Sequence, residues 1–196
     1  MSPPSYYAKA FCGEGNNVKT AEVIMKAYIK TEQLEIMPFR IKDFSDLAEL
    51  LTNSEIKKTF MIPDSETREA LNGMVQKIAQ YSLSNQRFER GIFLEDRLIG
   101  FVNEVERKDG SMELGYVIHP SLWGRGYATE MLKAVIEMLL EAGLSQVITG
   151  AFEENTASIR VMEKCGMRKT AVEEDIAYRG RNHHCIYYSF EKGQCN

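Results

Sequence analysis

Several features that mark particular protein classes are absent from this chain of 196 residues. No apolar run approaches the ~18 residues expected of a membrane-spanning helix, and residues 1–20 have no apolar core before a small-residue cleavage site. The formal net charge of −4 lacks the basic excess that drives nonspecific nucleic-acid binding. We therefore expect no membrane partner, no nucleic-acid partner and, by default, a cytoplasmic location.

Cysteine and histidine are also sparse, with four and three residues respectively. The cysteines show no CxxC spacing, and the histidines add no zinc-ligand pattern. His183, His184 and Cys185 are consecutive, so in a strand they alternate between faces and cannot converge on one ion. The pattern predicts reduced thiols and no metal site.

The composition that is present is ordinary for a globular protein, with 44% hydrophobic and 27% charged residues. Length and pattern indicate one domain over residues 31–190 and a tail over 191–196. Residues 1–30 read as an extension whose second half, 18–30, has the pattern of a helix. An alternative is that this extension mediates protein interactions.

Hydrophobic periodicity and turn residues predict the order of elements. A strand starting at Thr31 is followed by a helix capped near Asp43 and by a helix over 65–83 capped by Ser65 or Thr67. Three antiparallel strands follow between 91 and 118, and then a helix over 128–142. The last elements are a strand over 146–152, a short helix ending at Gly166 and a strand over 185–190. This order indicates a mixed α+β domain.

The stretch "HPSLWGRGYATEML", residues 119–132, places two glycines and an arginine at the start of a helix. The first amides of a helix lack intrahelical partners and carry partial positive charge, which favours a phosphate there. Gly124 and Gly126 permit close backbone approach, and Arg125 adds charge. The Walker and dinucleotide patterns are both absent. The stretch is therefore either a diphosphate site or only a turn.

The longer stretch "ELGYVIHPSLWGRGYATEML" resembles the acetyl-CoA-binding core of the GNAT N-acetyltransferases, with Trp123-x-x-Gly126-x-Ala128 at the turn that holds the coenzyme diphosphate. Trp123 is typical of the branch that resembles the ribosomal-protein alanine N-acetyltransferases. "TEQLEIMPF" and "NTASIRVMEKCGM" are similar to two further family segments, with Met37 and Met167 as departures, and His184 replaces an aspartate in the closing strand.

This resemblance covers about residues 31–190. It implies a GNAT-like fold with a central, mostly antiparallel twisted sheet of about six to seven strands flanked by helices. It also implies acetyl-CoA as co-substrate and a primary amine as acceptor, and leaves a homodimer open. The residues implied in coenzyme binding are Val117, Ile118, Trp123, Gly124, Arg125, Gly126, Tyr127, Ala128, Thr129, Asn155 and Ser158.

The resemblance also implies how the reaction is catalysed. A backbone N–H near Val117 or Ile118 would bind the thioester oxygen. Glu113 is the candidate base for the amine, or else an anchor for it or a solvated carboxylate. Met162 stands where many GNAT enzymes place a tyrosine that protonates the leaving thiolate. Ser158 is the alternative donor, or else only a hydrogen-bonding residue at the helix start.

Other roles stay open in the sequence. Asn155 can cap its helix as well as contact the coenzyme, and Tyr116 either borders the acceptor cleft or packs between sheet and helix. The acidic run 173–175 either attracts a cationic amine or is a solvated strand edge. The missing tyrosine equivalent motivates a different class of function, a catalytically silent module that senses acyl-CoA or acts as a scaffold.

Overall fold

The computed structural model describes residues 28–84 and 86–193. Within them the elements are β1 (Ile29–Lys30), β2 (Leu34–Met37), α2 (Phe44–Thr52), α3 (Arg68–Leu83), β3 (Glu89–Leu94), β4 (Arg97–Lys108), β5 (Ser111–Ile118), α4 (Tyr127–Glu141), β6 (Gln146–Phe152), α5 (Thr156–Lys164), β7 (Arg168–Tyr178) and β8 (Arg181–Glu191). Short 3₁₀ turns cover Ile41–Asp43, Ile56–Lys58 and Pro120–Leu122. No helix in these ranges is long and apolar enough to cross a bilayer.

All the described strands belong to one sheet, in the order β1-β2-β3-β4-β5-β6-β8-β7. Neighbouring strands run antiparallel except for β5 and β6, which are parallel and are connected by α4. The α+β fold class and the mostly antiparallel sheet are confirmed, but the sheet has eight strands rather than six or seven. Two strands are missing from the predicted order: β1, which has only two residues, and β7, whose side chains are mostly exposed and so show no alternating apolar pattern.

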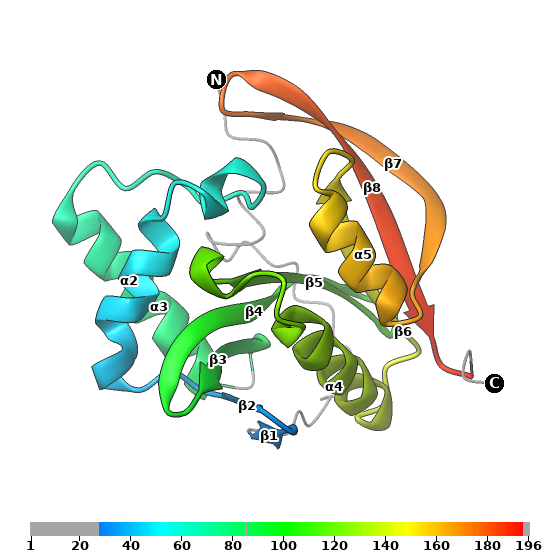
Figure 1. Cartoon of the computed structure of the whole chain (residues 1–196), viewed down its shortest axis with the longest axis horizontal. Coiled ribbons are helices and arrows are strands. Elements are labelled where there is room, and N and C mark those ends of the chain that lie inside the picture. Colours follow the sequence, from blue (N-terminus) through cyan, green and yellow to red (C-terminus); the bar gives the residue numbers. More distant parts are fainter. Residues whose placement is uncertain (1–27, 85, 194–196) are drawn as a thin grey trace.

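The helices cover the two faces of the sheet in pairs (Figure 1). α4 and α5 pack on one face against side chains from β5 and β6, including Met112, Leu114 and Val147. α2 and α3 pack on the other face against Phe93, Phe101 and neighbouring side chains. Alternate residues of β5 therefore belong to different cores, as expected for a strand buried on both sides.

The predicted helix starts are partly right. Thr67 caps α3 by accepting a hydrogen bond from the amide of Ala70 at 3.1 Å. Asp43 precedes α2 but does not cap it, because its buried carboxylate accepts hydrogen bonds from the backbone and guanidinium of Arg40. The helix expected over 18–30 lies mostly outside the described residues, and its end is wrong, because Ile29–Lys30 pairs with β2.

The parallel pair β5–β6 comes apart halfway along its length. Its last paired residues are Leu114 and Thr149, and both strands continue for several residues beyond them. Each strand has a glycine at the next position, Gly115 and Gly150. Neither glycine puts a side chain into the gap that opens between the two strands.

The packing of α4 on the sheet predicts a large loss of stability when its core face is truncated. Leu139 is fully buried, so Leu139→Ala is expected to lower the free energy of unfolding by about 3 kcal/mol. Glu137→Ala, on the exposed side of the same helix, is expected to change it by less than about 0.5 kcal/mol. Urea denaturation of the two variants measures the difference, and equal losses would contradict this packing.

Candidate coenzyme and acceptor sites

The end of β5 has backbone groups that neither neighbouring strand uses. In the antiparallel β4–β5 ladder, the amide of His119 donates to the Ile99 carbonyl at 2.7 Å. Because such hydrogen bonds alternate along a strand, the N–H of Val117 also points to β4, and those of Tyr116 and Ile118 point the other way. The latter two face the gap left by β6. Of the two backbone amides expected as donors to the thioester oxygen, that of Ile118 faces the gap and that of Val117 does not. The amide of Tyr116, which sequence reasoning did not name as a donor, also faces the gap.

The start of α4 presents further unused amides. Gly124 and Gly126 have φ of 75° and 90°, a conformation that favours glycine, and a Cβ atom at either position would meet only open space. Gly126 is the N-cap and no side chain caps the helix. The helix dipole adds partial positive charge to the amides of its first turn, residues 127–129. This turn is suited to an anion.

The N-terminal segment of the sheet anchors this helix start. The Glu130 carboxylate accepts hydrogen bonds from the backbone and side-chain amides of Gln33, both at 2.8 Å, and from the Thr31 hydroxyl. Burial acts to raise the pKa of Glu130, but these hydrogen bonds outweigh it and hold the pKa below its ordinary value. Thr31 and Gln33, from the segment "TEQLEIMPF", therefore position the first turn of α4.

A cavity of about 430 Å³ runs from this helix start into the gap between β5 and β6. It is lined by all but one of the residues implied in coenzyme binding: Val117, Ile118, Trp123, Gly124, Gly126, Tyr127, Ala128, Thr129, Asn155 and Ser158. Arg125, the exception, is exposed and outside the lining. Trp123 is 51% exposed, and its indole N–H donates to the Ile118 carbonyl at 2.6 Å.

Helix α5 forms one wall of this cavity. The Asn155 side chain accepts a hydrogen bond from the Ser158 amide at 3.2 Å and so caps the helix. The Ser158 hydroxyl lies 2.7 Å from the hydroxyl of Tyr116, which reaches it from β5. Met162 is fully buried in the core. Tyr116 thus packs between sheet and helix, and it also lines the cavity.

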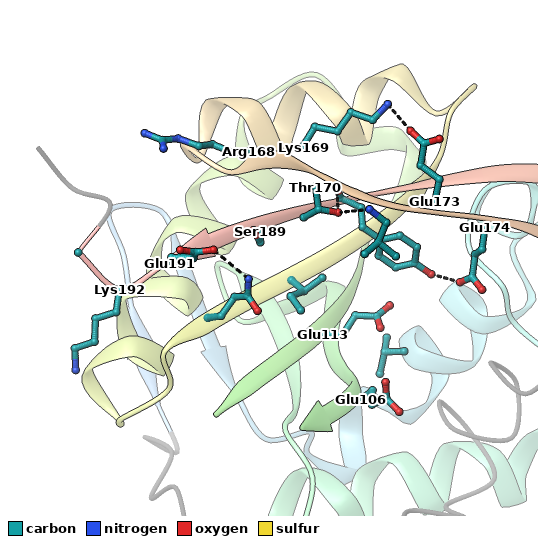
Figure 2. Close-up of a pocket in the computed structure, with 16 residues that line it drawn as sticks. Glu106, Glu113, Arg168, Lys169, Thr170, Glu173, Glu174, Ser189, Glu191 and Lys192 are labelled. Atoms are coloured by element: carbon teal, nitrogen blue, oxygen red, sulfur yellow. Dashed lines mark hydrogen bonds and ion pairs between the residues drawn. The ribbon is translucent and has the colours of Figure 1, made fainter. Parts of the chain in front are cut away.

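Glu113 lines a second, larger cavity of about 980 Å³, on the face of the sheet opposite α4 and α5 (Figure 2). Glu106, Glu173 and Glu174 line the same cavity, as do three basic residues, Arg168, Lys169 and Lys192. The Tyr187 hydroxyl donates to the Glu174 carboxylate, and burial together with this contact raises the pKa of Tyr187. This cavity can receive a polar, cationic molecule.

The two cavities are neighbours along three strands. Glu113 and Gly115 lie two residues apart on β5, so they share a face at a spacing of about 6.6 Å. Residues 148 and 150 on β6 and residues 187 and 185 on β8 are related in the same way, one lining each cavity. The Tyr187 ring lies against Gly150, where a Cβ would come within 2.8 Å of it. The two cavities are therefore adjacent along these strands, with the Tyr187 ring lining the larger one.

The side chains of the run His183-His184-Cys185 alternate between the two faces of β8, as expected, and each has different surroundings. His183 is buried, with Nδ1 2.6 Å from the Glu154 carboxylate, whereas His184 contacts Asp175 on β7. Cys185 lines the smaller cavity, and burial raises the pKa of its thiol to about 12. Across the two described ranges, no group of three acidic, histidine or cysteine side chains is placed to hold a metal.

Comparison with known proteins identifies the family. The model of the acetyltransferase (GNAT) domain matches residues 33–168, well over half of the chain. The chain belongs to the GNAT family. It is therefore an acetyl-CoA-dependent acetyltransferase. A curated relative, the uncharacterized N-acetyltransferase YnaD of Bacillus subtilis, is 29% identical over 164 residues, covering 82% of this chain and 94% of the relative.

Solved GNAT structures share the fold. An acetyltransferase from Bacillus anthracis superposes with a TM-score of 0.70 at 27% identity and covers 84% of this chain and 98% of its own. RimL, a ribosomal L7/L12 alpha-N-protein acetyltransferase solved with coenzyme A, has a TM-score of 0.75 at 16% identity and covers 84% and 97%. At 16% identity, the similarity to RimL supports a shared fold and nothing more.

The anchoring of α4 through Glu130 predicts a pH dependence of stability. Because its pKa is depressed in the folded state, its contribution is present above the unfolded value near ~4.3 and is lost as the pH falls through the lower folded value. Glu130→Gln is expected to be less stable than the wild type at pH 6, with the difference shrinking toward pH 3. Urea denaturation across this range tests it, and a constant difference would contradict it.

Proposed function

We propose that this GNAT enzyme transfers the acetyl group of acetyl-CoA to a primary amine by direct attack in a ternary complex. The observation that carries the proposal is the cavity that enters the gap where β5 and β6 part, with the larger cavity next to it along the same strands. Coenzyme in the narrower cavity would bring its thioester to the gap, and an amine would approach it from the larger one. A protein N-terminus and a small-molecule amine both fit this scheme.

Coenzyme binding would use the start of α4 and the end of β5. The amides of Tyr127, Ala128 and Thr129 would hold the diphosphate, with Gly124 and Gly126 allowing close approach and Arg125 adding charge at the rim. Pantetheine would lie along the unpaired end of β5, with Trp123 and Asn155 lining its path. The structure of RimL with coenzyme A shows that a GNAT neighbour binds this molecule.

The chemical steps follow from groups at the gap. The amide of Ile118 or Tyr116 would donate to the thioester oxygen as negative charge develops, a contribution typically worth ~3–4 kcal/mol. At pH 7 an α-amine costs about 1 kcal/mol to deprotonate and a lysine-like amine about 4–5 kcal/mol. Glu113, facing the acceptor-side cavity, would take the amine proton directly or through water. Ser158 would donate a hydrogen bond to the departing thiolate.

Diphosphate binding at the start of α4 predicts an effect of charge at Gly126. Gly126→Asp is expected to weaken CoA binding at least about tenfold, because a carboxylate there repels the phosphates and neutralises the partial positive charge of the helix N-terminus. Gly143→Asp is the matched control, since Gly143 lies at the other end of α4 with φ of 108° and open space around it. Isothermal titration measures both affinities, and equal affinities would contradict the site.

A role for Glu113 as base predicts a loss confined to kcat. Glu113→Gln is expected to lower kcat at pH 7 about 100-fold or more, measured as thiol release from acetyl-CoA with a panel of peptides, polyamines and aminoglycosides. Glu106→Gln makes the same charge change in the same cavity and is expected to alter mainly KM. Equal effects on kcat would contradict the base assignment. Tight acetyl-CoA binding without thiol release for any amine would favour a silent binding module.

A further inference from the structure

The proposed reaction leaves one requirement for which this chain lacks the usual residue. When the carbon–sulfur bond breaks, its electron pair leaves on sulfur, and a hydrogen-bond donor stabilises the resulting thiolate. Met162, at the position of the tyrosine found in many GNAT enzymes, has only a thioether, which cannot donate. It is also fully buried in the core. The donor must therefore be another residue.

Two hydroxyl groups meet at the cavity wall where this donor is needed. Tyr116 crosses from β5 to the first turn of α5, and its hydroxyl lies 2.7 Å from Ser158 Oγ and 3.4 Å from the Ser158 carbonyl. Both residues line the cavity that holds the coenzyme in the proposed function. In the part of the chain that the structure describes, the Tyr116 hydroxyl is the one hydrogen-bond partner of Ser158 Oγ.

We propose that Tyr116 is a positioning residue that directs the Ser158 hydroxyl hydrogen at the leaving sulfur. This rests on the proposed function. The phenol has one hydrogen and Ser158 Oγ is its nearer acceptor, so when Tyr116 donates to Oγ, the Ser158 hydrogen is left to point into the cavity. A thiolate there selects this arrangement, because it accepts that hydrogen. Both hydroxyl groups then donate in one direction, from the core of the sheet toward sulfur.

The surroundings of Tyr116 suit this role. Burial raises the pKa of its hydroxyl, although the Ser158 contact acts to lower it, so the phenol stays protonated and remains a donor. No proton has to leave the pair during turnover. For a neutral amine, the proton lost by nitrogen balances the one that the sulfur finally gains. Tyr116 also follows directly after Gly115, at the point where β5 and β6 part, so the same short segment supplies a phenol and a free backbone amide.

A spectroscopic titration of bound CoA tests the pair without an acceptor. The ultraviolet absorbance of the thiolate is followed against pH in the complex with CoA, with the complex with acetyl-CoA as blank. Removing the donated hydrogen bond by Ser158→Ala, or its orientation by Tyr116→Phe, is expected to raise the thiol pKa by about one unit, equivalent to about tenfold. The double variant is expected to shift no further than Ser158→Ala alone, because the two act as a unit.

The control is Tyr188→Phe. Tyr188 also reaches α5, with its hydroxyl 3.5 Å from Glu163, but it belongs to the core and not to the cavity lining. This variant is expected to leave the thiol pKa unchanged. Thermal unfolding of every variant checks that each one is folded. An unshifted pKa in either Tyr116→Phe or Ser158→Ala, or additive shifts in the double variant, would overturn the inference.

Turnover separates this inference from the proposed function. With an active amine, Tyr116→Phe is expected to lower kcat about tenfold while KM for acetyl-CoA stays within about twofold. A KM that rises with kcat unchanged would show a merely structural role and overturn the inference. Absence of turnover in the wild type with every amine would overturn the proposed function alone, because the thiol titration does not depend on an acceptor.

Discussion

The proposed active site depends on the separation of two parallel strands. β5 and β6 are paired through Leu114 and Thr149 and then diverge. Backbone groups that would have bonded across the sheet are left for a ligand, and buried backbone groups without partners are costly unless something bonds them. The glycines that follow the last pair keep side chains out of the opening, and the rings of Phe60 and Tyr187 lie against Gly115 and Gly150. The smaller cavity occupies this opening, and the start of α4 lines it as well.

Local features of this arrangement are readable from the sequence because they depend on neighbouring residues. The strand predicted over 146–152 has its true bounds, because this segment is rich in β-branched residues. The turn before α4 was identified because only glycine readily adopts the positive φ found at Gly124 and Gly126. The cap at Thr67 follows the usual preference at helix starts. Each of these signals lies within a few residues of the feature that it predicts.

The features that sequence reasoning missed depend on residues far apart in the chain. Tyr116 and Ser158 are 42 positions apart, and nothing in either segment shows that their hydroxyl groups meet. The choice between Val117 and its neighbours as amide donors depends on the register of β5 against β4, which shifts at a bulge between Glu104 and Glu106. The sequence names Glu113 as the candidate base, but the face of the sheet on which its carboxylate lies follows only from that register.

The central claim is that the divergence of β5 and β6 is the coenzyme site, and a crystal structure of the enzyme with bound CoA tests it most directly. The account predicts diphosphate oxygens within hydrogen-bond distance of the amides of residues 127–129. It also predicts pantetheine between the two strands, with its sulfur near Ser158 and the amide of Tyr116 or Ile118 directed into the gap. CoA bound on another surface, or β5 and β6 paired along their whole length in the complex, would contradict the account.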